Sequence, residues 1–232
     1  MSIFQAIVLG LVQGITEFLP ISSSGHLVLF PALLGWELQD VAFDAMVHLA
    51  TLLVMLIYFR RDIVEILRER RRVFWMILVA TLPILVVGYW LETSGVVLRS
   101  LPVVFVSLAG WGIVLMIADA HASRRLVTTT PGTTTPGTIS QLSWSKTLLV
   151  GVVQAIALIP GTSRSGITIT AGLFAGLDRK LATRLAFLVG IPAIAAAGLK
   201  KTLDIASGAV EIELVPLVFG FVAAFVSGYI AV

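Results

Sequence analysis

The amino-acid sequence predicts an all-α integral membrane protein, built as an inverted-topology repeat with two re-entrant helical hairpins and about five transmembrane spans. Hydrophobic residues make up 58% of the 232 residues and charged residues only 12%, and the mean hydropathy of +1.02 is far above that of soluble domains. Apolar segments of bilayer length recur along the chain. Two further apolar segments are broken by Pro, Ser and Gly and share a sequence pattern.

The two broken segments cover residues 3–36 and 148–177. Continuous helices are not expected there, because Pro and Gly interrupt the apolar run. No basic residue precedes the first segment and no A-x-A cleavage site is evident. We therefore expect the N-terminus to be part of the fold rather than a removable signal peptide.

Five uninterrupted apolar segments are each close to the length of about 20 residues that a helix needs to cross a bilayer. They cover residues 43–59, 73–91, 101–118, 181–199 and 214–232. Three of these spans separate the two broken segments, and an odd number of crossings inverts the second copy.

Aligned at a constant offset, the two broken segments form an internal repeat. The matched pairs are Gly10 with Gly151, Gln13 with Gln154, Ser22 with Ser163, Ser24 with Ser165, and Gly25 with Gly166. We expect one domain, 1–232, with a first repeat over 1–118, a cytoplasmic linker over 119–147 and an incomplete second repeat over 148–232. The linker contains a low-complexity Thr/Pro/Gly run. Only two spans follow the second copy, so a sixth span is expected to be missing at the C-terminus.

Twelve of the 16 Lys and Arg residues agree with one membrane orientation. The first cytoplasmic cluster consists of Arg60, Arg61, Arg68, Arg70, Arg71 and Arg72. Topology alone explains this run, although such a run can also bind anionic lipid. The hairpins then enter from opposite sides, and their tips meet near mid-depth at a cavity. The basic residues follow the ends of apolar segments, so no nucleic-acid partner is expected. Arg99, Lys200 and Lys201 fall outside the pattern.

The first broken segment contains an acid and an amide that share a helix face, Gln13 and Glu17. A carboxylate in the membrane interior costs at least about 2.5 kcal/mol on insertion scales, so Glu17 is a functional candidate. The pair suits a network that holds a cation or a phosphate. The structural alternative is a Glu17 that reaches water or forms a permanent ion pair.

The tip of the first hairpin carries hydroxyls, amides and an imidazole. Ser22, Ser23, Ser24 and Gly25 can present hydroxyl and N–H groups to phosphate oxygens. His26 is a candidate nucleophile or general acid/base. For any single serine, capping of a helix end is the better interpretation.

The tip of the second hairpin carries Arg164, which aligns with Ser23 in the repeat. Its guanidinium suits bidentate contacts with phosphate in a water-poor site. Ser163, Ser165 and Thr168 can donate hydroxyl groups around the same anion. The structural alternative is that Arg164 pairs with Glu17 and locks the hairpins together, which is compatible with a substrate displacing the pair.

The remaining titratable residues carry weaker signals. His48 follows Asp44 by one turn and borders the expected cavity, yet a satisfied bundle histidine is the favoured interpretation. His121 is expected to be solvated. The absence of cysteine excludes disulfides, thiolate metal sites and thiol nucleophiles.

The strings QGITEFLPISSSGHL and PGTSRSG resemble the paired signature of the undecaprenyl-diphosphate phosphatase family, associated with bacitracin resistance. The resemblance also includes FDAMVHLATLL and covers the chain from about Ile3 onward. It implies hydrolysis of the lipid diphosphate to the monophosphate, at a site open to the exterior face of the plasma membrane, with a divalent cation such as Mg²⁺ or Ca²⁺.

By motif position, the resemblance makes Glu17, Ser23, His26 and Arg164 catalytic and makes Glu17 and Gln13 the cation ligands. It does not decide between Ser23 and His26 as the attacking group. Gln13 stands where family members can have Glu, so cation binding would rest more on Glu17. The expected partners are a polyprenyl diphosphate and membrane lipids, and a homodimer is left open.

A transporter or flippase of a polyprenyl phosphate is the rival hypothesis, because inverted repeats with broken helices are also the layout of secondary transporters. A purely structural scaffold would leave Glu17, His26 and Arg164 without a role. Release of inorganic phosphate distinguishes the enzyme from the transporter.

Overall fold

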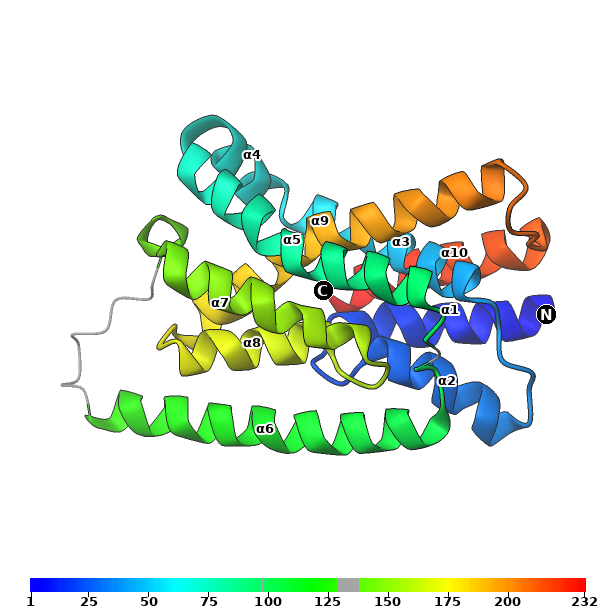
Figure 1. Ribbon diagram of the computed structural model, residues 1–232, viewed down its shortest axis with the longest axis horizontal. Coiled ribbons are helices and arrows are strands. Elements are labelled where there is room, and N and C mark those ends of the chain that lie inside the picture. Colours follow the sequence, from blue (N-terminus) through cyan, green and yellow to red (C-terminus); the bar gives the residue numbers. More distant parts are fainter. Residues whose placement is uncertain (97, 129–137) are drawn as a thin grey trace.

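Every regular element that the structure describes is a helix (Figure 1). The computed structural model describes residues 1–96, 98–128 and 138–232. Five helices are long and apolar enough to cross a membrane: α3 (Val41–Tyr58), α5 (Arg71–Ser94), α6 (Leu101–Thr128), α9 (Arg179–Ala206) and α10 (Leu214–Ala231). The predicted all-α membrane class and its five spans are confirmed. The Thr/Pro/Gly run of the expected linker lies almost entirely outside the described residues.

Both broken segments form pairs of helices that are too short to span a bilayer. The first pair is α1 (Ile3–Glu17) and α2 (Ser23–Leu34). The second pair is α7 (Trp144–Gln154), continued by the 3₁₀ turn η2 (Ala155–Leu158), and α8 (Arg164–Phe174). The short helix α4 (Arg60–Glu69) joins α3 to α5, and the 3₁₀ turn η1 (Ile139–Gln141) precedes α7.

The two breaks have the same local cause. Ser22 is the N-cap of α2 and accepts a hydrogen bond from the N–H of Gly25, while Ser163 is the N-cap of α8 and accepts one from the N–H of Gly166. Each serine thus satisfies one of the free N–H groups of a helix start. Gly161 lies in the turn before α8 at a φ of 91°, where a side chain would meet the backbone of Val104.

The two helix pairs enter the molecule from opposite ends. In Figure 1, α1 begins near the end that carries the N-terminus, whereas α7 begins near the other end, next to the start of α5. The two turns meet in the middle, because Ser165 in α8 donates to the backbone oxygen of Leu19 at 3.4 Å. Their re-entrant placement in a bilayer and the inverted repeat stay predictions.

Helix α1 is held against α10 by small residues. A Cβ at Gly10 would overlap the backbone of Gly220, and a Cβ at Gly14 would overlap Ser227 and the backbone of Ala224. Glycine therefore lets the two backbones approach, as in many helix pairs in membranes. This contact fixes α1, which ends at Glu17.

Candidate active site

Glu17 is the centre of a buried polar cluster that joins the two turns. Its side chain is 5% exposed. Arg164 donates from Nη2 to Glu17 Oε1 at 2.6 Å, and Ser23 donates from Oγ to Glu17 Oε2 at 2.6 Å. Gln13 donates to the same oxygen at 3.1 Å. The expected convergence of Glu17 and Arg164 is thus present and includes Ser23. The imidazole of His26, which was expected beside them, bonds to the backbone of Ser22 instead.

His48 approaches this cluster from a third element, α3. Its Nδ1 donates to the backbone oxygen of Asp44 at 2.7 Å, since a carbonyl can only accept. In the neutral ring Nε2 is then an acceptor. This atom lies 3.5 Å from Ser23 Oγ and 3.5 Å from Glu17 Oε2. Nδ1 is satisfied within its own helix, as expected of a bundle histidine. The position of Nε2 beside Ser23 and Glu17 was not expected.

A glycine on α9 makes room for the guanidinium. A Cβ built at Gly190 would lie 2.6 Å from Arg164 Cζ, far inside van der Waals contact. Arg164 Nη1 is buried on this side and has no hydrogen-bond partner. The guanidinium is therefore held by Glu17 and by the shape of α9, and one of its nitrogens is left without a partner.

The cluster lines a cavity of about 820 Å³. Its polar residues include Glu17, Ser22, Ser23, Ser24, His48, Ser163, Arg164 and Ser165. Its apolar wall comes mainly from α5 and α9, including Ile84, Leu85, Leu91, Ala193, Ile194 and Ala197. A charged headgroup at the turns and an apolar chain along the wall are the ligand that such a lining fits.

Three basic residues outside the cluster also line this cavity: Arg99, Lys200 and Lys201. Arg99 binds Asp44 at 2.6 Å, and both lysines bind Glu92 of α5, at 2.8 and 2.9 Å. Sequence reasoning did not assign them to the site. The available signal was that these same three residues broke the positive-inside pattern.

Four of the expected site residues do not line the cavity. Thr168 is fully buried and donates to the backbone oxygen of Arg164 at 2.6 Å. The N–H of Gly25 donates to the capping hydroxyl of Ser22, and Gln13 reaches the site only through Glu17. His26 donates from Nδ1 to the backbone oxygen of Ser22 at 2.7 Å. The functional roles expected of these four residues stay predictions.

The residues at the turns fit a protein-held divalent cation poorly. Both oxygens of Glu17 already accept hydrogen bonds. Gln13 Oε1 is buried without a hydrogen-bond partner, so it could supply one neutral oxygen ligand. A dedicated Mg²⁺ or Ca²⁺ site needs more oxygen ligands from the protein than this one. Among the described residues, no group of three or more His, Asp or Glu side chains is placed to hold a metal.

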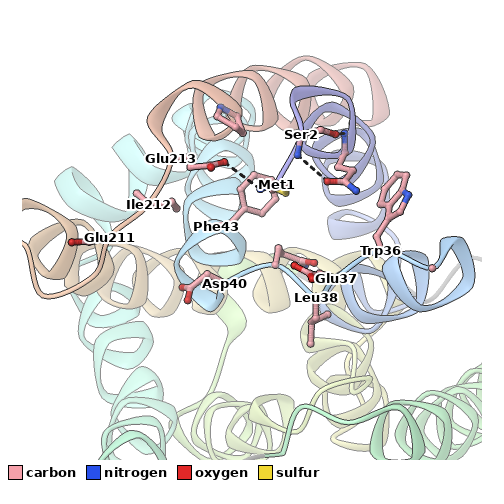
Figure 2. A pocket seen from close by; sticks show the side chains of 14 residues that line it. Met1, Ser2, Trp36, Glu37, Leu38, Asp40, Phe43, Glu211, Ile212 and Glu213 are labelled. Carbon is pink, nitrogen blue, oxygen red and sulfur yellow. Dashed lines mark hydrogen bonds and ion pairs between the residues drawn. The ribbon is translucent and has the colours of Figure 1, made fainter.

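A second cavity, of about 570 Å³, lies apart from the cluster, beside the N-terminus (Figure 2). Glu37, Asp40, Glu211 and Glu213 contribute to its lining, and the amino group of Met1 binds Glu213 at 3.2 Å. The acidic side chains that line this second cavity are exposed, and none of the residues of the Glu17 cluster lines it.

Fold and cavity together define a polytopic membrane protein that places an acid, a serine and a guanidinium in the lining of a largely apolar cavity. The chain belongs to the family of the bacitracin resistance protein BacA, whose model matches residues 6–232. The resemblance noted in the motifs is thereby confirmed.

Several curated relatives carry the name undecaprenyl-diphosphatase. The protein from Chlorobaculum tepidum is 42% identical and is matched over 100% of this chain and 87% of its own length. The protein from Marinobacter nauticus is 41% identical, over 100% and 88%. The protein from Pelodictyon phaeoclathratiforme is 44% identical, over 87% and 75%.

Proposed function

We propose that this protein hydrolyses undecaprenyl diphosphate to the monophosphate and inorganic phosphate, which recycles the lipid carrier of cell-wall synthesis. The observation that carries the proposal is the Glu17–Ser23–Arg164 cluster, which lines a cavity together with a largely apolar wall. The names of the relatives support the same substrate.

Arg164 has the chemistry to bind the diphosphate. A substrate phosphate replaces Glu17 as its partner, and the planar guanidinium then donates two parallel hydrogen bonds. Nη1, which has no hydrogen-bond partner within the protein, gains one. The serine hydroxyls of the two turns, from Ser22, Ser24, Ser163 and Ser165, donate to the remaining phosphate oxygens.

Ser23 is the attacking group that the geometry favours. Its Oγ already donates to Glu17 Oε2 at 2.6 Å, so Glu17 can accept the proton as Oγ forms a bond to the terminal phosphorus. The bond between this phosphorus and the bridging oxygen breaks, and the lipid monophosphate leaves. Water then cleaves the phosphoserine, releases inorganic phosphate and restores Ser23.

His26 is the competing candidate for attack or proton transfer. The motif supports it, but its ring lies outside the cavity lining and donates to the backbone oxygen of Ser22. Trapping a phosphoenzyme from labelled substrate distinguishes Ser23 from His26 as the attacking group. Phosphoserine is stable in acid and is cleaved by alkali, whereas phosphohistidine is stable in alkali and is cleaved by acid.

A divalent cation, Mg²⁺ or Ca²⁺, is part of the proposal only as an ion carried by the diphosphate oxygens and water, in the way Mg²⁺ accompanies many phosphate substrates.

We further propose that the protein lies in the plasma membrane with the cavity open to the exterior. The homodimer stays a prediction that the mass of the protein in detergent would test.

Phosphate release by purified protein tests the function. Undecaprenyl diphosphate should yield inorganic phosphate, and Ser23→Ala and Glu17→Gln should abolish the release. Movement of a polyprenyl phosphate from one leaflet of a vesicle membrane to the other, without release of inorganic phosphate, would favour the transporter hypothesis instead.

A further inference from the structure

The short helix α4 lies at a membrane surface because of the two spans that it connects. Helix α3 ends at Tyr58 and α5 begins at Arg71, and both are long and apolar enough to cross a bilayer. Helix α4, Arg60–Glu69, fills the joint between them and is not itself a candidate span. In Figure 1 it projects beside the start of α5, at the end opposite to the N-terminus.

Two aromatic side chains mark the headgroup level on either side of α4. Tyr58 at the end of α3 and Trp75 in the first turns of α5 are each 57% exposed. Tyrosine and tryptophan are enriched at membrane–water interfaces, where a ring can meet both acyl chains and polar headgroups. They place α4 among the headgroups rather than in free solvent.

The joint carries four exposed arginines to which no ion pair is assigned in the described part of the chain: Arg61, Arg68, Arg71 and Arg72. Two of the three acids of α4 form ion pairs with residues outside this set of four, and no ion pair is assigned to the third, Glu69, in the described part of the chain. Glu65 binds Arg70 at 3.1 Å, and Asp62 binds Arg184 of α9. The four guanidinium groups are therefore free to bind anions from outside the protein.

Apolar side chains share the exposed face of α4 with these charges. Val64 and Leu67 are 47% and 54% exposed, whereas Ile66 is 6% exposed and packs in the core. Val64 and Arg68 are four residues apart and so lie on one face. A helix with this mixed face rests in the headgroup region, with apolar tips toward the acyl chains and arginines toward the phosphates.

We propose that this arginine corner, formed by Arg61, Arg68, Arg71 and Arg72, binds the phosphate groups of anionic phospholipids. A topology signal requires only that positive charge lie on one side of the membrane. It does not require four unpaired guanidinium groups flanked by interfacial aromatics and exposed Val64 and Leu67. The corner is separate from the cavity and does not depend on the proposed hydrolysis.

The absence of cysteine from the chain makes a direct test practical. A donor fluorophore is attached through Glu69→Cys, and the protein is reconstituted in phosphatidylcholine vesicles. Energy transfer is compared between a trace of acyl-labelled phosphatidylglycerol and a trace of acyl-labelled phosphatidylcholine. The double variant R68Q/R72Q is compared with K146Q/K180Q, which removes two positive charges elsewhere.

The expected result is stronger transfer from phosphatidylglycerol than from phosphatidylcholine in the parent protein. R68Q/R72Q should lower this preference by up to about fivefold for each arginine removed, which corresponds to about 1 kcal/mol. K146Q/K180Q should retain it, and 1 M salt should weaken it. Access of an impermeant thiol reagent to the thiol at position 69, measured before the fluorophore is attached, checks that every variant has the same orientation.

Two results would overturn the proposal. One is equal transfer from both lipids in the parent protein. The other is an equal loss of preference in the two double variants, which would mean that charge acts over the whole surface and not at this corner. Neither result bears on phosphate release, which is measured separately.

Discussion

Gly190→Ala tests whether the observed position of Arg164 is needed for the reaction. The added Cβ would lie 2.6 Å from Arg164 Cζ, whereas carbon atoms in contact are about 3.5–4.0 Å apart. Nη1 of the same guanidinium would lie closer still, so the group must move by at least about 1 Å. A shift of this size lengthens the 2.6 Å bond to Glu17 beyond hydrogen-bond range.

The expected loss of activity follows from this shift. Misplacing a catalytic or positioning group by about 1 Å can cost about 100-fold in rate, so kcat/KM for phosphate release from undecaprenyl diphosphate should fall by about that factor. Overpacking of the α9 surface should also lower the free energy of unfolding by about 1–3 kcal/mol. Assays are therefore run well below the unfolding midpoint of the variant.

Gly110→Ala is the matched control, because a Cβ at Gly110 of α6 would meet no atom within 4 Å. It should leave kcat/KM unchanged and stabilise the helix slightly. Full activity in a folded Gly190→Ala protein would refute the reasoning, since the guanidinium would then be free to work from another position.

Four further substitutions test the cluster and the packing that supports it. Glu17→Gln leaves the buried guanidinium of Arg164 without a carboxylate, so the free energy of unfolding should fall by about 3–5 kcal/mol. An unchanged thermal midpoint of unfolding in detergent would contradict the ion pair. His48→Leu removes the polar atom 3.5 Å from Ser23 and should lower kcat by about tenfold or more. His48→Gln should restore part of the loss if the residue only positions Ser23, and none if it accepts a proton. Gly14→Ala should separate α1 from α10 and lower the thermal midpoint, at a cost of about 1–3 kcal/mol; a midpoint equal to that of the parent would show that the contact is not tight.

Hydropathy and helix breakers were sufficient to predict the five spans and the two broken segments. A run of about 20 apolar residues has few alternatives to a spanning helix. The meeting of Glu17 with Arg164 was also predictable in outline, since neither charge is tolerated alone in the membrane interior. These inferences need only composition and position along the chain.

The rotation of each helix about its axis was not predictable from spacing. His48 faces Ser23 because of how α3 packs against its neighbours, and no local pattern encodes that angle. The same holds for His26, whose ring lies outside the cavity although Ser23, one turn earlier, lines it. The cavity wall contributed by Lys200 and Lys201 depends likewise on the tertiary contact of α9 with α5.

The bond between Glu17 and Arg164 joins positions 147 residues apart. A ribosome therefore delivers the carboxylate to the bilayer long before the guanidinium that neutralises it. With the first hairpin placed in the bilayer as predicted, the nascent first half carries a charge without its counterion during that interval, which is costly in lipid. Hydrolytic competence can arise only when the later half inserts, so a prematurely terminated chain should be inert as well as unstable.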